Sequence, residues 1–235
     1  MKVIGLLGGM SWESTVPYYR YVNEAVKARL GGLHSARLVL YSVDFHDIEQ
    51  LQREGRWQEA GVLLAEAAVA VQRAGADFLV LCTNTMHKVA PVIEQAISIP
   101  LLHIADATAA AVKRCKITTV GLLGTRFTME QDFYIDRLRK RHALEVLVPD
   151  ASDREEVHRV IYEELCVGRL LASSREAYRR VIERLVARGA QGIVLGCTEI
   201  ALLVEAEQFA VPIFDTTKLH AQHAAACALS ENTER

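Results

Sequence analysis

Short apolar segments recur along this 235-residue chain, and longer segments with helical periodicity separate them. The apolar segments are residues 3–8, 36–43, 78–82, 118–124, 144–149 and 192–196. Strands of this length, alternating with amphipathic helices, are typical of parallel sheets that are covered on both faces. The sequence therefore predicts an α/β fold. Capping-box patterns, in which a Ser or Thr precedes a Glu or Gln by three residues, predict helix starts at Thr128, Ser152 and Ser173.

The two halves of the chain resemble each other. The segment "GADFLVLCTNT" from Gly75 aligns without a gap with "GAQGIVLGCTE" from Gly189, at an offset of 114 residues. In the same order, "KVIGLLGGMSWES" matches "TTVGLLGTRFTME", and "IPLLHIAD" matches "VPIFDTT". We interpret the chain as a duplicated α/β unit, with one lobe of residues 1–102 plus 215–235 and a second lobe of residues 103–214. Ligands of open α/β sheets bind beyond the carboxyl ends of the strands, so we expect the site in a cleft between the lobes.

Charge and cysteine usage exclude several classes of function. The formal net charge is -2 and no long basic run occurs, which gives no electrostatic support for binding nucleic acid or a membrane surface. The N-terminal apolar segment is too short for a signal peptide or a membrane span. The five cysteines lack metal-ligand spacing and suit reduced thiols, so we expect a cytoplasmic protein without a metal site. A small polar molecule remains the expected partner.

Two adjacent residues at the end of one apolar segment are candidates for a reactive position. The internal alignment pairs Thr83 with Cys197, whereas Cys82 pairs with Gly196. Neighbouring side chains on a strand point to opposite faces, so we expect Thr83 to face the cleft and Cys82 to be a buried strand thiol. Cys197 is followed by a segment that reads as a first helical turn, whose dipole would favour the thiolate. Two groups on opposite sides of a ligand suit proton transfer at a tetrahedral carbon, as racemases and epimerases require.

Several histidines and glycines are candidates for alternative sites. His87 is either a cleft residue or an ordinary polar group at a helix start. His220 and His223 lie one turn apart but lack a third ligand, so we interpret them as a solvated helix face. The glycines after the first apolar segment do not form G-x-G-x-x-G or a P-loop, so nucleotide binding is not expected. No residue is marked as a pyridoxal lysine, and we expect no cofactor.

The motifs "GLLGGMSWES", "TNTMH", "GLLGT" and "GCTE", in this order over essentially the whole length, resemble the aspartate/glutamate racemase family. The resemblance implies a cofactor-independent homodimer with two α/β domains related by a pseudo-twofold axis, in which two opposed cysteines usually act as acid and base. It also implies a substrate site, in which Cys197 is the principal acid/base. Asn84, Thr85 and Thr198 would hold the carboxylate or ammonium group of the amino acid, and Glu199 is counted with them. Met10, Ser11 and Thr125 would line the cleft through backbone N–H groups.

This chain departs from the family pattern at three positions. Thr83 stands where the family usually has its first cysteine, and a hydroxyl is too weak an acid to become an anionic base near neutral pH. We therefore expect an enzyme that handles one enantiomer much better, with L the more favoured assignment. Cys166 occupies the position of a family lysine, and Gln52 could donate a hydrogen bond in place of a family arginine. Aspartate and glutamate are the expected substrates. The alternatives are a broader amino-acid range, a single-thiol decarboxylase or isomerase of the same superfamily, or a non-catalytic amino-acid-binding protein.

Overall fold

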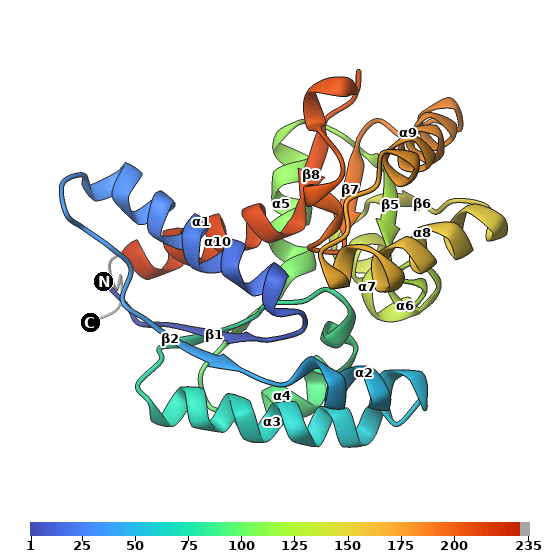
Figure 1. Ribbon diagram of the computed structural model, residues 1–235. Helices are drawn as coiled ribbons and strands as arrows, with labels where there is room; N and C mark the ends of the chain where they lie inside the picture. The colour runs from blue at the N-terminus through green and yellow to red at the C-terminus, as the bar shows by residue number, and fades with distance from the viewer. Residues whose placement is uncertain (231–235) are drawn as a thin grey trace. The chain divides into compact units, whose positions relative to one another are not determined.

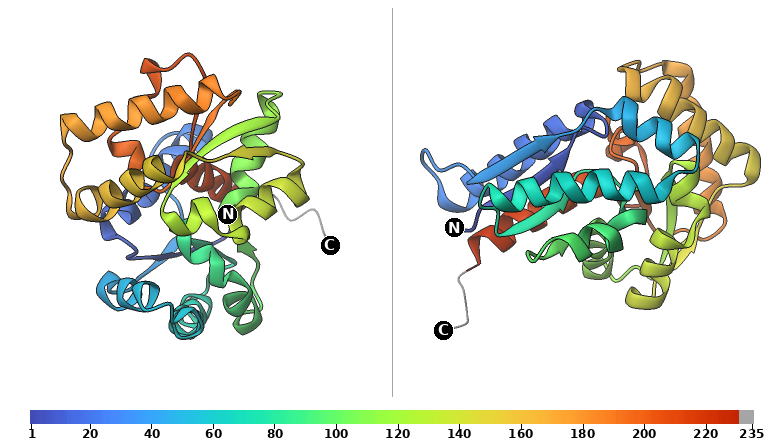
Figure 2. Two further views of the ribbon diagram at one scale, coloured as in Figure 1. Left: turned by 90° about the vertical axis from the view of Figure 1, so that its right-hand side faces the viewer. Right: turned by 90° about the horizontal axis from the view of Figure 1, so that it is seen from below.

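The computed structural model describes residues 1–230 and confirms an α/β fold with two compact units (Figures 1 and 2). Unit 1 contains Met1–Ile104 and the segment from His220 onward, and unit 2 contains Ala105–Leu219. Each unit holds one four-stranded parallel sheet. In the described part of the chain, none of the helices has both the length and the apolar character that crossing a membrane requires.

The elements of unit 1 alternate between strands and helices, as the sequence predicts. They are β1 (Ile4–Gly8), α1 (Trp12–Leu30), β2 (Leu38–Ser42), α2 (Phe45–Arg53), α3 (Trp57–Arg73), β3 (Phe78–Leu81), the 3-10 helix η1 (Thr85–Val89), α4 (Ala90–Ala96) and β4 (Leu101–Leu102). The strand order is β2-β1-β3-β4, so β1 and β3 are the central strands.

Unit 2 repeats this order of elements with additional short helices. They are α5 (Ile104–Arg114), β5 (Thr119–Gly124), α6 (Arg126–Glu130), α7 (Asp132–Asp136), the π-helix η2 (Arg137–Arg141), β6 (Glu145–Leu147), α8 (Ala151–Glu163), η3 (Leu165–Val167), α9 (Ala172–Ala187), β7 (Ile193–Gly196), η4 (Ile200–Leu202), η5 (Ala206–Gln208), β8 (Ile213–Asp215) and α10 (Thr216–Leu229), which continues into unit 1. The strand order β6-β5-β7-β8 matches that of unit 1, as expected for a duplicated unit. β4 and β8, which were not predicted as strands, are only two and three residues long.

The two faces of the unit 1 sheet are covered by different helices (Figure 1). Alternate residues of β3 point to opposite faces: Phe78 and Val80 pack with α1 and α10, whereas Leu79 and Leu81 pack with α2, α3 and α4. α3 and α4 pack against each other, as Figure 2 shows from below. Each large aliphatic side chain buried in this way contributes roughly 1.5–3 kcal/mol.

In unit 2, helices α8 and α9 cover one face of the sheet. Leu123, Ile193 and Leu195 of the central strands are fully or almost fully buried against these two helices. Tyr178 of α9 is completely buried, and its hydroxyl donates a 2.8 Å hydrogen bond to the carbonyl oxygen of Val157 on α8. A buried phenol needs such a partner, so this bond also fixes the two helices against each other.

The predicted helix starts are wrong at all three positions. Thr125, not Thr128, is the N-cap of α6, and its side-chain oxygen accepts a hydrogen bond from the backbone N–H of Thr128. α8 begins after Asp150 and α9 after Leu171, which places Ser152 and Ser173 inside these helices. Asp150 and Leu171 have the extended conformation of an N-cap residue, although neither makes a side-chain capping bond. A side-chain cap therefore accompanies the start of α6 but not the starts of α8 and α9.

Gly9, in the turn between β1 and α1, provides a test of how closely this turn packs. Its φ is +92°, and a Cβ atom there would lie 2.1 Å from the carbonyl oxygen of Val43. Gly75 has nearly the same φ, +94°, with nothing within 4 Å of the same atom. We expect Gly75→Ala to lower the free energy of unfolding by about 1–2 kcal/mol through left-handed strain alone. Gly9→Ala should lower it by about 2–5 kcal/mol, because backbone must also move. Urea denaturation followed by circular dichroism measures both losses, and equal losses would contradict this account.

Candidate active site

The turn between β1 and α1 is fixed by hydrogen bonds from side chains of α1. The backbone N–H of Gly9 donates to Thr15 Oγ1 at 2.9 Å, and Thr15 Oγ1 and Ser14 Oγ donate to the carbonyl oxygen of Ser11 at 2.8 and 2.9 Å. Ser11 is buried, as is Met10, and the peptide bond between them is cis. The two predicted substrate-binding residues of this turn therefore lie in a buried, hydrogen-bonded segment at the carboxyl end of β1.

The carboxyl end of β3 carries the first candidate reactive position. Thr83, Asn84 and Thr85 follow the strand and are all buried, with 3–6% of their surfaces exposed. Cys82 is completely buried among the side chains that pack with α1 and α10, and its thiol lies 3.7 Å from the carbonyl oxygen of Val80. Burial raises the pKa of the Cys82 thiol far above its usual range. The interpretation of Cys82 as a buried strand thiol is confirmed.

His87 of η1 holds the backbone of Thr83 in place. Its Nδ1 lies 2.7 Å from the carbonyl oxygen of Thr83, and its Nε2 lies 3.2 Å from the backbone N–H of Ile104. A carbonyl can only accept, so we assign the proton of a neutral imidazole to Nδ1, with Nε2 accepting from Ile104. The ring also contacts His103, with ring centroids 4.2 Å apart. His87 is therefore a buried supporting residue behind Thr83, and not an ordinary polar group at a helix start.

Gln52 lies beside the same strand end. It is buried on α2, and its amide nitrogen donates to the sulfur of Met86 at 2.9 Å. Met86 follows Thr85 directly, so the fold brings α2 next to the segment after β3. Unit 1 thus brings together the predicted residues from its two strand ends and from α2.

The carboxyl end of β5 in unit 2 carries the predicted residue Thr125. Its hydroxyl is 3.2 Å from that of Thr128, and the side chain is 4% exposed. Because Thr125 caps α6, its side chain is engaged in the turn.

The carboxyl end of β7 carries a buried cluster of a thiol, a hydroxyl and a carboxylate. Glu199 Oε2 accepts hydrogen bonds from Cys197 Sγ at 3.0 Å and from Thr198 Oγ1 at 2.6 Å. The other carboxylate oxygen, Oε1, accepts from Cys166 Sγ of η3 at 3.7 Å. Glu199 is 2% exposed and Cys197 is 7% exposed. Unit 2 therefore holds its predicted catalytic thiol against a carboxylate that three donors surround.

The electrostatics of Cys197 differ from the sequence prediction. Burial first, and then the negative charge of Glu199, raise the pKa of Cys197 well above its usual range. The segment after Cys197 is also no α-helix but the three-residue 3-10 helix η4. The predicted helix dipole, which would have favoured the thiolate, is therefore wrong, because a dipole needs a longer run of aligned peptides. Cys197 rests as a protonated thiol.

Cys166 and Glu164 are neighbours of this cluster that sequence reasoning did not assign. Cys166 contacts Glu199 across 33 residues of sequence, and no local pattern indicates such a contact. The only sequence signal was that Cys166 replaces a lysine of the family pattern. Glu164, two residues earlier, is 6% exposed and accepts hydrogen bonds from Ser174 and Arg159.

The interpretation of His220 and His223 as a solvated helix face is wrong for His220. His220 is completely buried, with Nδ1 2.9 Å from the hydroxyl of Tyr18 and Nε2 2.8 Å from the carbonyl oxygen of Leu102. His223, on the next turn, is exposed. The face of α10 that carries His220 packs on the sheet, where small alanines leave room for an imidazole. Among residues 1–230, no group of three His, Cys, Asp or Glu side chains could hold a metal ion.

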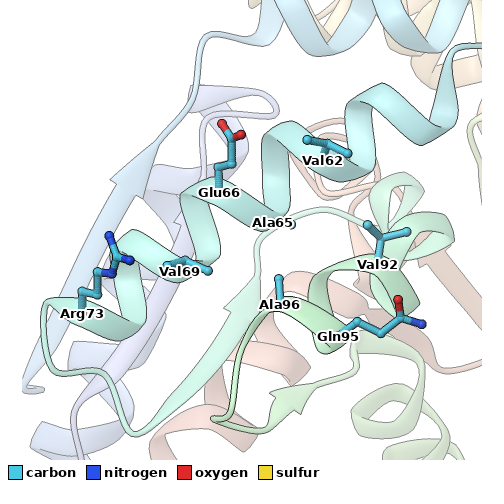
Figure 3. Close-up of a pocket in the computed structure, with 8 residues that line it drawn as sticks. All are labelled: Val62, Ala65, Glu66, Val69, Arg73, Val92, Gln95 and Ala96. Carbon is cyan, nitrogen blue, oxygen red and sulfur yellow. The ribbon is translucent and has the colours of Figure 1, made fainter.

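Two surface hollows of about 470 and 460 Å³ lie on the helices of unit 1. The first runs along α3 and α4, and its apolar lining includes Val62, Val69 and Val92, with the charges of Glu66 and Arg73 beside it (Figure 3). The second lies on α2 and α3. None of the predicted site residues lines either hollow, so neither is the candidate active site.

Comparison with known proteins identifies the family. The model of the Asp/Glu/hydantoin racemase family matches residues 7–224, and the chain belongs to this family. A crystal structure of a proposed Asp/Glu racemase from Yersinia pestis is 61% identical, with a TM-score of 0.91, over 98% of this chain and 100% of that one. An aspartate racemase homologue from Pyrococcus horikoshii is 34% identical, with a TM-score of 0.85 and the same coverage. The broad-specificity amino-acid racemase RacX of Bacillus subtilis is 23% identical over 92% of this chain and 93% of that protein.

Proposed function

We propose that this chain is a pyridoxal-independent amino-acid racemase, an isomerase that acts on aspartate and glutamate. Membership of the Asp/Glu/hydantoin racemase family supports this function. The observation that carries it is the buried hydrogen bond between the thiol of Cys197 and the carboxylate of Glu199 at the end of β7. A thiol beside a carboxylate can exchange one proton with it, which is what an acid/base group at an α-carbon needs.

Cys197 acts as the principal acid/base in this proposal. As a base, its thiol proton passes to Glu199 Oε2, the electron pair stays on sulfur, and the thiolate takes the α-proton of the substrate. As an acid, the thiol gives its proton to the α-carbanion, and Glu199 remains a carboxylate. The buried position supports this role, because exclusion of water strengthens the charge interactions that stabilise a carbanion-like state.

Thr83 acts on the opposite face of the α-carbon in this proposal. The backbone contact from His87 supports it, because it fixes the residue that the internal alignment pairs with Cys197. A hydroxyl cannot serve as an anionic base near neutral pH, so proton transfer on this face goes through the hydroxyl and water. One enantiomer, which we assign as L, is then turned over much better. The equilibrium of a racemisation is an equal mixture, so the preference shows in kcat and KM.

In this proposal the polar residues that follow β1, β3, β5 and β7 bind the substrate. Asn84, Thr85 and Thr198 hold the amino-acid carboxylate or ammonium group, and backbone N–H groups near Met10, Ser11 and Thr125 bind a carboxylate. Glu199, counted among the binding residues by resemblance, acts in this proposal through Cys197. Gln52 offers an amide in place of an arginine. This weaker donor set is compatible with a broader amino-acid range, as the name of the RacX relative suggests.

Loss of one thiol keeps a second candidate function open. A superfamily enzyme with a single cysteine could decarboxylate or isomerise its substrate instead, and the threonine at position 83 is the observation that favours it. Such an enzyme need not exchange the α-proton of an amino acid with solvent, which separates it from a racemase.

Incubation with single enantiomers of aspartate and glutamate in deuterated water tests the racemase function. We expect solvent deuterium at the α-carbon, read by proton NMR, together with slow formation of the other enantiomer, read by chiral chromatography. Cys197→Ala should abolish both signals, because it removes the thiol that acts as the principal acid/base. Cys115→Ala, at an exposed cysteine, is the control and should keep both. Absence of deuterium with all common amino acids would contradict the racemase function and favour the single-thiol alternative or a binding protein.

Thr83→Cys tests the cause of the enantiomer preference. A second thiol supplies a stronger acid and base on that face, so kcat for the disfavoured enantiomer should rise by about tenfold or more. Thr83→Val, which removes the hydroxyl at nearly constant volume, should lower kcat for both enantiomers. Polarimetry of the two directions measures the change. Unchanged rates in both variants would remove Thr83 from the proposed mechanism.

We also propose that the chain forms a homodimer through α1 of unit 1. Trp12, Val16 and Tyr19 lie four and three residues apart on this helix, and they are 65%, 57% and 54% exposed. A stripe of large apolar side chains on one helix face favours burial against a second copy. Light scattering should give about twice the 26.1 kDa mass of the chain, and Val16→Glu should return it to that of the monomer. Val62→Glu, in the hollow of Figure 3, is the control and should stay dimeric. A monomeric wild type would refute the proposal.

A further inference from the structure

We propose that Cys166 is a positioning residue that controls, through Glu199, which of Glu199 and Cys197 holds the proton they share. The inference rests on the proposed function only in giving Cys197 the acid/base role. Cys166 contacts the carboxylate of Glu199 and is assigned no contact with the substrate. The chemistry is a hydrogen bond that stabilises one of two proton arrangements.

The geometry places the carboxylate between two thiols. Cys166 Sγ is 3.7 Å from Oε1 of Glu199, and Cys197 Sγ is 3.0 Å from Oε2. The two thiols therefore donate to different oxygens and do not compete for the same lone pairs. Thr198 adds a third donor, again to Oε2. A change in the charge of Glu199 therefore changes the electrostatic potential at both sulfur atoms.

Cys166 is held firmly enough to have a defined effect. The residue before it, Leu165, is completely buried in the core of unit 2. Glu164 accepts hydrogen bonds from Arg159 on α8, at 3.0 Å, and from Ser174 on α9, and so ties the η3 turn to both helices. The turn ends at Gly168, whose φ of 74° lets the chain leave in the left-handed conformation. The position of the Cys166 thiol is thus set by buried neighbours.

The direction of its effect follows from the charges. The pair can exist as a thiol and a carboxylate, or, after the proton moves from Cys197 Sγ to Glu199 Oε2, as a thiolate and a carboxylic acid. A donor at Oε1 stabilises the carboxylate and so favours the thiol of Cys197. Removal of that donor raises the proton affinity of Glu199 and increases the fraction of Cys197 thiolate. Because a thiol is a weak donor and the contact is long, we expect a change of about three- to tenfold.

A substitution at Cys166 leaves the other titratable residues near Cys197 and Glu199 in place. Burial raises the pKa of Tyr178 on α9 well above its usual range, so it stays neutral, and its hydroxyl donates to Val157. Glu156 and Glu164 also act on this region, and both are bonded to Arg159 of α8. A substitution at Cys166 removes the contact between its thiol and Glu199 Oε1.

Cys166→Ala and Cys166→Ser, which differ in whether they keep a donor, test the inference. The readout is the initial rate of alkylation of Cys197 by iodoacetamide as a function of pH, followed on the isolated peptide by mass spectrometry. We expect Cys166→Ala to raise the rate near pH 7 by about three- to tenfold, and Cys166→Ser to stay within about twofold of the wild type. The acid limb of the pH profile of kcat/KM should move to higher pH in Cys166→Ala by about half a unit to one unit.

The effect of Cys166→Ala is also measured in a chain that carries Glu199→Gln, where the carboxylate is absent. Glu199→Gln removes the negative charge that raises the pKa of Cys197, so alkylation should be faster, and adding Cys166→Ala should then have no further effect. An unchanged rate in Cys166→Ala, or an equal increase with and without Glu199, would overturn the proposal. Because alkylation needs no turnover, the expected rates in a chain that exchanges no deuterium would support the role of Cys166 and refute only the racemase function.

Discussion

The buried carboxylate of Glu199 is the constraint on which the arrangement of unit 2 depends. A carboxylate removed from water costs several kcal/mol unless hydrogen bonds replace its hydration. Here Cys197, Thr198 and Cys166 provide three donors, from the end of β7 and from η3. The core between α8 and α9 therefore has to bring η3 to the strand end, and the bonds of Glu164 to both helices accomplish this.

The two units show how one framework can carry different chemistry at matched positions. Both sheets have the same strand order, and both reactive candidates follow the second central strand. In unit 1 the segment is anchored by the imidazole of His87, which bonds to the carbonyl oxygen of Thr83 and to the backbone N–H of Ile104. In unit 2 the matched segment carries a charge beside the thiol. The duplicated fold thus fixes where the groups stand, whereas the residues of each copy decide whether the position is polar and neutral or strongly charged.

The sequence predicts what periodicity controls and misses what long-range contact controls. The six apolar segments contain the strands β1, β2, β3, β5, β6 and β7. The alternation of side chains along a strand also correctly predicts that Cys82 is buried. The predicted helix starts are wrong, because Thr128, Ser152 and Ser173 lie inside helices that begin at earlier residues. His220 was misjudged because its partners, Tyr18 and Leu102, lie 202 and 118 residues away. The contact of Cys166 with Glu199 was invisible for the same reason.

The negative charge of Glu199 beside Cys197 determines which protonation state the thiol has at rest. A nearby positive charge or helix N-terminus would lower the pKa of the thiol and keep it as a thiolate, which oxidants and alkylating agents attack readily. A neighbouring carboxylate does the opposite, because it raises the pKa of the thiol and keeps the thiol protonated. In the proposed base step, the thiolate forms by moving a proton over the 3.0 Å between Sγ and Oε2, without charge entering or leaving the buried cluster. Transfer within the cluster avoids the desolvation cost of a second buried anion, which is the larger barrier in an interior of low dielectric constant. In the proposed mechanism, Glu199 is the proton acceptor beside the buried thiol of Cys197, which is how that thiol would serve as a base.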